Sequence, residues 1–388
     1  MMIRVLDSTL REGEQTPGVY MDSHVKQEIA RLLDAVGVDL IEAGHPMVSD
    51  DIRIAVRDVA RLDLNAAIVA HARSLRGDIE AAVETGVGMI GLFYCVSDDR
   101  LDTVFRTSLR EAIDQITDSI RYAKRLNPKL MIRYTPEDTV RSPFINVVEA
   151  ASEAVAAGAD VISVADTTGY MMPGVRSMYD YVSRLREALN ARNADPVIAV
   201  HCHNDRGLAL ANALDGCRAG ATIVDATVLR LGERTGITDL AELLFNLHDG
   251  FGENRWNLPA LNELYRIVSK YSYFPISKNH PLVGENAFTH NAGVHTHAWI
   301  KKNSHYESVD PALVGRRSSV CLDNMSGVAS VKFALERMNV PDIDDRMILC
   351  LLNEVKAIGR RGRAVDEAEL GLLVRSYRQS LTLLRRAE

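Results

Sequence analysis

The stretch Val197–His203, which reads VIAVHCH, is apolar and rich in β-branched residues until it ends in polar side chains. Such a run predicts a buried β-strand. Runs of this kind alternate with amphipathic segments such as Gly174–Leu189, which are long enough to return the chain to the same end of a parallel sheet. The alternation repeats eight times before about residue 250. The predicted strands are Ile3–Thr9, Asp39–Gly44, Ala66–Ala72, Met89–Val96, Leu130–Thr135, Val161–Ala165, Val197–His203 and Thr222–Leu229.

Eight strand–helix units predict an α/β fold with a (β/α)8 barrel, the TIM barrel, over residues 1–250. An open doubly wound sheet is the alternative. That fold usually has fewer strands and carries a glycine-rich phosphate-binding turn after the first one. Here Ser8–Glu14 reads STLREGE and contains no such turn, so the barrel is preferred.

The alternation stops after Phe251, where Asn, Pro, Tyr and His become frequent. We expect residues 251–326 to be a linker and lid segment that carries functional loops. Helical periodicity returns from about Gly327 and predicts a small α-rich C-terminal subdomain over 327–388. Its predicted helices are Val328–Met338, Asp344–Gly359 and Glu367–Ser376.

The composition is that of an ordinary soluble globular protein, with 47% hydrophobic and 25% charged residues in a chain of 388. A net charge of −7 disfavours nucleic acid as a partner. Five cysteines without C-x-x-C spacing predict reduced thiols. Neither a signal-peptide pattern nor an apolar run of membrane-spanning length occurs, so we expect a cytoplasmic protein without a membrane partner.

Polar residues are unusually dense where the predicted strands end, which is where barrel enzymes carry their chemistry. The first strand leads to Asp7, Arg11 and Glu12, and the third ends at His71. The remaining candidates follow the fifth to eighth strands: Arg133, Thr135, Glu137, Asp138, Asp166, Thr167, Thr168, His201, His203, Asn204, Asp205, Glu233 and Arg234.

The strongest single signal is His201-x-His203. Residues i and i+2 of a strand point to one side, so both imidazoles can reach a common centre at the barrel mouth. Two neutral imidazoles and a carboxylate from the end of the first strand would leave open positions on a catalytic metal ion. This mixed N/O set suits Zn²⁺, Mn²⁺, Co²⁺ or Mg²⁺ and does not choose among them.

Two arginines near the mouth call for anionic partners. Arg11 lies in the first strand–helix turn, which favours a functional role over that of a solvated surface charge. Arg133 shares a strand face with Thr135 and Glu137, and a barrel interior holds an arginine only if an anion pairs with it. A substrate anion or a neighbouring acid would fill this role. His71 alone is more simply interpreted as a core or rim histidine.

These motifs together resemble the family of homocitrate synthases and 2-isopropylmalate synthases. The resemblance runs from residue 3 to about 335. It is carried by DSTLREGEQ at residues 7–15, TPED at 135–138, HCHND at 201–205 with Gly207, Ala211 and Asn212, GERTG at 232–236 and FTHNAGVH at 288–295.

The resemblance implies a metal-dependent Claisen-type condensation. Acetyl-CoA would add through its methyl carbon to the keto carbon of a 2-oxo acid, and the thioester would then be hydrolysed. Glu12, His201 and His203 would hold the divalent metal, which polarises the keto group.

The resemblance also implies roles for individual residues around this centre. Arg11 would stabilise charge that develops on oxygen, and Thr167 would contact the C1 carboxylate. His295 and Tyr306 look like the family's lid pair, which enters the active site of the neighbouring subunit, and Glu137 would act with them. A homodimer that exchanges lids follows from this.

The choice of 2-oxo acid depends on Arg133. The corresponding position is typically an acid in isopropylmalate synthases, whereas Arg133 with His71 and Thr135 beside it is similar to homocitrate synthases. A cation with polar neighbours suits a second anionic group, and 2-oxoglutarate is the leading candidate. Oxaloacetate or a phosphono-2-oxo acid would satisfy the same cation. Arg230 and Leu231 before Gly232, and Thr135 in place of the common serine, depart from the homocitrate synthase pattern.

Other activities remain as alternatives: a 2-isopropylmalate-, citramalate- or phosphonomethylmalate-type synthase, a lyase acting on 3-hydroxy-3-methylglutaryl-CoA, and a non-catalytic binding protein. The lyase would be expected to carry a cysteine in a glycine-rich loop near the eighth strand, yet Arg230–Gly236 has none. The retained Glu12, His201 and His203 argue against the binding protein.

Overall fold

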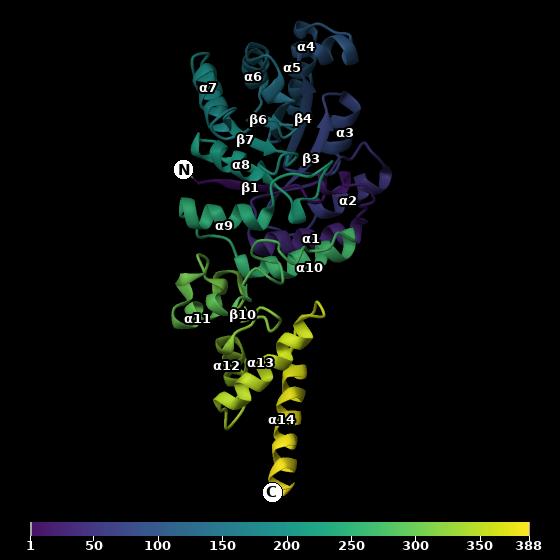
Figure 1. Ribbon diagram of the computed structural model, residues 1–388. Helices are drawn as coiled ribbons and strands as arrows, with labels where there is room; N and C mark the ends of the chain where they lie inside the picture. The colour runs from purple at the N-terminus through teal and green to yellow at the C-terminus, as the bar shows by residue number, and fades with distance from the viewer. Residues whose placement is uncertain (1, 388) are drawn as a thin grey trace. The chain divides into compact units, whose positions relative to one another are not determined.

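The computed structural model describes residues 2–387, and its first part is a closed barrel of eight parallel strands (Figure 1). Each strand pairs with the next along the chain, and β1 pairs with β8 through the register Leu6 to Asp225. The predicted TIM barrel is confirmed. Its strands are β1 Arg4–Asp7, β2 Leu40–Gly44, β3 Ala67–Arg73, β4 Met89–Cys95, β5 Met131–Glu137, β6 Val161–Asp166, β7 Val197–Cys202 and β8 Ile223–Ala226.

Helices between the strands cover the outside of the barrel (Figure 1). Local sequence explains their ends: in α5, Ser108 and Glu111 form a capping box, and in α1 the Asp22 side chain accepts from the Val25 amide. The helices of this part are α1 Ser23–Val36, α2 Asp50–Ala60, α3 Arg76–Val83, α4 Asp98–Arg100, α5 Leu109–Leu126, α6 Phe144–Ala157, α7 Met178–Asn190, α8 Ala209–Arg218, α9 Leu240–Phe251 and α10 Leu261–Ser272.

Strand β8 ends three residues earlier than the sequence predicts. The chain turns after Thr227, and Leu229 and Arg230 adopt left-handed backbone conformations with φ of 60° and 57°. Gly236 closes this loop with φ of 71°, and a Cβ atom there would lie 1.5 Å from the Arg230 carbonyl oxygen. Only glycine fits that position, which explains the second glycine of the GERTG motif.

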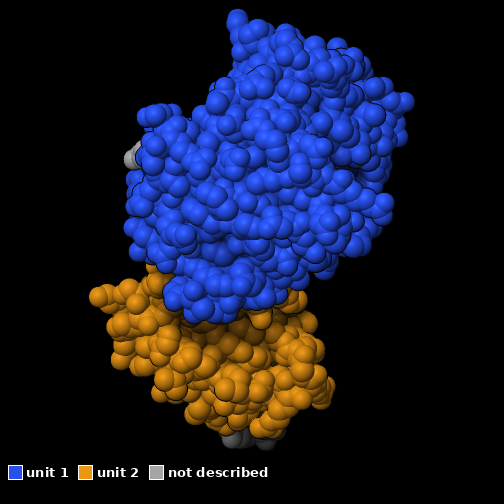
Figure 2. All heavy atoms as spheres, turned by 90° about the horizontal axis from the view of Figure 1, so that it is seen from above, with its two compact units in different colours: residues 1–276 blue, residues 277–388 orange. Residues whose placement is uncertain are grey.

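The chain divides into two compact units, residues 1–276 and 277–388, which Figure 2 draws in different colours. Helix α10 belongs to the first unit, although it lies within residues 251–326, which we expected to be a linker and lid segment. The division predicted from sequence, 1–250, 251–326 and 327–388, stays a prediction. None of the described helices combines the length and apolar character that crossing a membrane requires.

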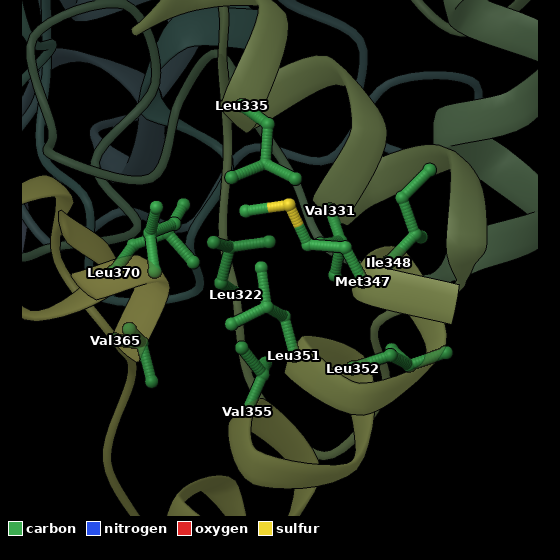
Figure 3. Close-up of a cluster of buried hydrophobic side chains, with 11 residues drawn as sticks. Leu322, Val331, Leu335, Met347, Ile348, Leu351, Leu352, Val355, Val365 and Leu370 are labelled. Carbon is green, nitrogen blue, oxygen red and sulfur yellow. The ribbon is translucent and has the colours of Figure 1, made fainter. Parts of the chain in front are cut away.

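The second unit has its own hydrophobic core, which is drawn in Figure 3. Helix α13 contributes Met347, Ile348, Leu351, Leu352 and Val355, a spacing of three to four residues that forms one face of a helix. The predicted α-rich character is confirmed. The elements here are β9 Thr289–His290, α11 Gly293–Lys301, β10 Ser319–Val320, α12 Val328–Arg337, α13 Asp345–Gly359 and α14 Glu367–Ala387.

Candidate active site

The barrel interior changes from apolar to polar within two residues along each strand except β4, where the second position is Gly91. The apolar layer consists of Leu6, Leu40, Val69, Met89, Met131, Val161, Ala199 and Ile223. Side chains two residues apart on a strand share a face, so the next inward position on each strand lies directly toward the C-terminal end. Those eight positions are Ser8, Glu42, His71, Gly91, Arg133, Ser163, His201 and Asp225. This layer, called the polar layer below, forms the floor of the candidate active site.

Glu12, His201 and His203 are buried and converge above this floor. One potential ligand atom from each lies within 4.8 Å of the others, and the two Nε2 atoms are 3.3 Å apart. Burial, followed by the neighbouring His201, lowers the pKa of His203 to about 3, so this ring is neutral near pH 7. Burial opposes ionisation of Glu12, but Arg11 and the two imidazoles outweigh it and hold its pKa below the ordinary value. A carboxylate facing two imidazole nitrogens is a donor set that fits a divalent metal ion.

Asp225 of the polar layer connects His201 to Arg133. Its Oδ2 lies 2.8 Å from His201 Nδ1 and accepts from Arg133 Nη2 at 2.6 Å, while its Oδ1 accepts from Arg133 Nη1 at 2.8 Å. Burial opposes the charge on Asp225, but Arg133 and His201 together lower its pKa. The sequence predicts that an anion pairs with Arg133, and in the structure a neighbouring acid, Asp225, fills this role.

Glu42 contacts both Arg11 and His71, as Asp225 contacts both Arg133 and His201. Its Oε2 accepts from Arg11 Nε at 2.7 Å and from Ser8 Oγ at 2.6 Å, and its Oε1 lies 3.1 Å from His71 Nδ1. Arg11 also pairs with Glu12. Burial opposes ionisation of Glu42, but Arg11 and His71 hold its pKa well below the ordinary value. Arg11 is thus oriented by two carboxylates, one of which is a candidate metal ligand.

His71 is a neutral hydrogen-bond acceptor toward the cavity. Burial, followed by the Arg11 charge, lowers the pKa of His71 to about 4. Since the Glu42 carboxylate can only accept, the proton of the neutral ring lies on Nδ1 and the lone pair on Nε2. Phe93 stacks on the ring with centroids 4.7 Å apart. An acceptor suits a hydroxyl or a water better than a second carboxylate.

The polar layer and the loops around it enclose a cavity of about 190 Å³. It brings together nine of the eleven residues predicted from sequence: Arg11, Glu12, His71, Arg133, Thr135, Glu137, Thr167, His201 and His203. Glu137 Oε1 forms an ion pair with Arg100 Nη1 at 2.6 Å, and Thr167 Oγ1 accepts from the Asp138 amide at 3.0 Å. Arg230 and Leu231, which depart from the family pattern, are not among the described residues that line this cavity.

The other two predicted residues, His295 and Tyr306, lie in the second unit. Their rings are 4.4 Å apart between centroids, tilted by 30°, and both side chains are exposed. They line a cavity of about 530 Å³ within that unit, together with His290 and Glu307. His290 Nε2 lies 2.9 Å from Glu307 Oε1.

Sequence reasoning missed Glu42 and Asp225, although they orient the predicted residues. Both sit inside apolar runs, LIEAG at 40–44 and IVDA at 223–226, and an isolated acid in a buried strand needs a buried partner. Both acids lie before the ends of their strands, whereas most of the candidates predicted from sequence lie at or after the ends. A step of two residues from the apolar layer toward the C-terminal end of each strand identifies both acids.

Comparisons with known proteins agree with this geometry. Residues 2–268 match the model of the HMGL-like family, and residues 282–363 match the homocitrate synthase post-HMGL domain-like family. The chain belongs to the HMGL-like family. The family predicted from the motifs is thereby confirmed.

Curated relatives cover most of the chain. A homocitrate synthase of Pyrococcus horikoshii is 42% identical over 91% of this chain and 94% of its own. A 2-isopropylmalate synthase of Methanocaldococcus jannaschii is 35% identical over 96% of this chain and 71% of its own. Among solved structures, the HMG-CoA lyase of Bacillus subtilis aligns with a TM-score of 0.60 at 20% identity, over 72% of this chain and 96% of that one. At this identity the lyase supports the barrel fold alone.

Proposed function

We propose that this protein condenses acetyl-CoA with a 2-oxo acid, and that its preferred 2-oxo acid is 2-oxoglutarate, which yields homocitrate. The observation that carries this is the convergence of Glu12, His201 and His203 within 4.8 Å, beside Arg11 and Arg133, in a chain 42% identical to a homocitrate synthase. The reaction removes a proton from the acetyl methyl group, forms a carbon–carbon bond to the keto carbon, protonates the keto oxygen and hydrolyses the thioester.

A divalent metal held by Glu12, His201 and His203 would polarise the keto group as a Lewis acid. Arg11, oriented by Glu42, donates to the oxygen on which negative charge develops. Thr167 provides a hydroxyl to the C1 carboxylate at the rim of the cavity. Glu12 and both histidines are buried, so their ligand atoms meet little bulk solvent.

Glu137, His295 and Tyr306 are proposed to deprotonate the methyl group, with His295 and Tyr306 supplied by a second subunit of a homodimer. The exposure of both rings supports this, because a pair that serves another subunit must be accessible. The test mixes inactive His295→Ala chains with inactive Glu12→Ala chains. Partial recovery of activity in hybrid dimers supports lid exchange, whereas a fully active monomer at assay concentration contradicts it.

The decisive assay for the reaction is release of free CoA from acetyl-CoA, measured with a thiol reagent against a panel of 2-oxo acids. The panel contains 2-oxoglutarate, oxaloacetate, pyruvate and 2-oxoisovalerate, each with and without a metal chelator. We expect metal-dependent release that is fastest with 2-oxoglutarate. Preference for 2-oxoisovalerate would instead support a 2-isopropylmalate-type synthase, a second candidate favoured by the pairing of Arg133 with Asp225, which lessens its attraction for a second anion.

A further inference from the structure

One carboxylate, Asp225, serves both the candidate metal ligand His201 and the candidate substrate contact Arg133. The three side chains are nearly inaccessible to solvent, with exposed fractions of 1% for Asp225, 6% for Arg133 and 11% for His201. The two contacts of Asp225 share an oxygen, since Oδ2 faces both His201 Nδ1 and Arg133 Nη2. A change in one contact therefore reaches the other without any intervening residue.

Toward the metal, Asp225 determines which nitrogen of His201 is free. A carboxylate accepts and cannot donate, so it keeps the proton of the neutral ring on Nδ1 and leaves the Nε2 lone pair facing His203. Nε2 is the atom 3.3 Å from His203 Nε2. Residues that orient metal-bound histidines in this way typically change metal affinity by 10–100-fold when replaced.

Toward the substrate, Asp225 occupies the end of the Arg133 guanidinium that would bind a carboxylate with two parallel hydrogen bonds. A guanidinium has five N–H donors. Asp225 takes two of them and Ser163 Oγ takes a third at 2.6 Å, so two remain. A distal carboxylate of a substrate would therefore share Arg133 with Asp225. By binding the two remaining donors, that carboxylate would fix Arg133 in place, and a fixed Arg133 keeps Asp225 oriented toward His201.

We propose that Arg133 is a positioning residue for the metal site, acting through Asp225, and that metal affinity and recognition of a distal anionic group on the 2-oxo acid are thereby coupled. The first half concerns the free enzyme, and the second half depends on the proposed function. The coupling is reciprocal, as any linkage between two binding equilibria must be.

The first experiment measures Mn²⁺ affinity of the full-length protein by titration calorimetry in the absence of any 2-oxo acid. We expect Asp225→Asn to weaken binding 10–100-fold and Arg133→Met to weaken it about tenfold, because the carboxylate loses the two donors that orient it. Arg133→Lys keeps the charge without the paired donors and should fall between Arg133→Met and the wild type.

The matched control is Arg255→Met. Arg255 forms the same two-hydrogen-bond pair with Asp39, at 2.9 and 2.7 Å, but at the opposite end of the barrel. Loss of the Arg255–Asp39 pair should leave the Mn²⁺ affinity within about twofold of the wild-type value. Unchanged Mn²⁺ affinity in a folded Arg133→Met protein would overturn the first half of the proposal, whether or not CoA release is ever observed.

The second experiment uses the wild-type protein and so does not depend on how a variant folds. It compares Mn²⁺ affinity in saturating 2-oxoglutarate with that in saturating 2-oxobutyrate, which offers the same keto and C1 carboxylate groups but no distal anion. We expect Mn²⁺ to bind about fivefold or more tightly with 2-oxoglutarate, and the difference to shrink in Arg133→Lys. Equal affinities in the wild type would overturn the coupling, while absence of CoA release with every acid would count only against the proposed reaction.

Discussion

The N-terminal and C-terminal ends of the barrel contain the same kind of Arg–Asp ion pair, but the two pairs have different roles. At the N-terminal end, Asp39 lies just before β2, pairs with Arg255 and accepts from the Val5 amide at 2.7 Å. At the C-terminal end, Asp225 pairs with Arg133 but also contacts His201, a candidate metal ligand. The N-terminal pair ties strands together, whereas the C-terminal pair also orients a side chain that can do chemistry.

Two lysines repeat this contrast. Lys124 donates to the Leu130 carbonyl at 2.8 Å and to Asp160 at 2.9 Å, just before β5 and β6 begin. Lys26 is fully buried and donates to the Leu10 carbonyl and to Glu14, which flank the turn that carries Arg11 and Glu12. It also donates to the Ala43 carbonyl on β2.

The pairs also differ in burial. Arg255 and Asp39 are 27% and 17% exposed, against 6% and 1% for Arg133 and Asp225. A buried pair costs more desolvation and adds little net stability, so its value lies in what it positions. The candidate active site at the C-terminal end therefore depends on buried polar contacts. A barrel with no chemistry to perform could replace these contacts with apolar packing.

The largest expected difference between the ends concerns the metal ligands. We expect His203→Ala to lower kcat about a thousandfold or more and to remove bound metal, because a lost Lewis acid forfeits several kcal/mol of transition-state stabilisation. CoA release and elemental analysis of the purified protein measure the two effects. His24→Ala, on the exposed face of α1, is the control and should leave both unchanged. Wild-type activity that survives exhaustive chelation would contradict the prediction.

The next prediction compares the two arginines in substrate recognition. At saturating metal, Arg133→Ala should raise KM for 2-oxoglutarate about 10–100-fold, since a hydrogen bond to a charged group contributes about 1.5–3 kcal/mol. The effect on pyruvate should be much smaller. Arg255→Ala should leave the KM for both acids unchanged and lower only the thermal unfolding midpoint. An equal rise in KM for both acids in Arg133→Ala would show that Arg133 does not discriminate between them.

We expect a smaller effect on kcat/KM for Lys26, and none for Lys124. Lys26→Met should lower kcat/KM about tenfold, because the turn that carries Arg11 and Glu12 loses donors worth roughly 1–3 kcal/mol. Lys124→Met should destabilise the fold without changing kcat/KM. Steady-state kinetics and denaturant unfolding of both variants test this. Identical kinetics in both proteins would mean that Lys26 supports only the fold.

The smallest change in turnover is expected for Asp7→Asn, whose effect is on stability and depends on pH. Asp7 is fully buried and its Oδ2 has no hydrogen-bond partner among the described residues. Burial raises the pKa of Asp7 from 3.8 to about 7. Between these values the folded protein binds more protons than the unfolded chain, so this contribution to stability is present below pH 4 and is lost as the pH rises through 7.

Asparagine carries no such charge, so Asp7→Asn should be close to neutral at pH 4 and stabilising by about 2–4 kcal/mol at pH 8. Denaturant unfolding at the two pH values measures it. Asp160→Asn, at the N-terminal end, removes an acceptor of the Lys124 ion pair and should destabilise at both. A pH-independent effect of Asp7→Asn would refute the buried-charge explanation.

Much of this architecture could be predicted because short-range patterns carry it. The strand at Val197–Cys202 follows from a continuous apolar run rich in β-branched residues, and the helix at Asp345–Gly359 from an apolar period of three to four residues. Helix α10 was missed although its buried stripe, which includes Leu261, Leu264 and Val268, has a helical period. The Asn, Pro, Tyr and His residues around this stripe are typical of loops and mask its helical period.

The sequence by itself determined the barrel, the approximate position of each strand, and Glu12, His201 and His203 as a candidate metal-binding set. The period of apolar residues and the shared face of residues i and i+2 depend only on residues that are close in sequence, so both can be recognised from the sequence. Only the tertiary structure decided which charges meet. Arg133 and Asp225 are 92 residues apart, and Arg11 and Glu42 are 31 apart. Pairing of β1 with β2 brings Arg11 to Glu42, and closure of the barrel brings β5 and β8 into one inward-facing layer, where Arg133 is buried beside Asp225.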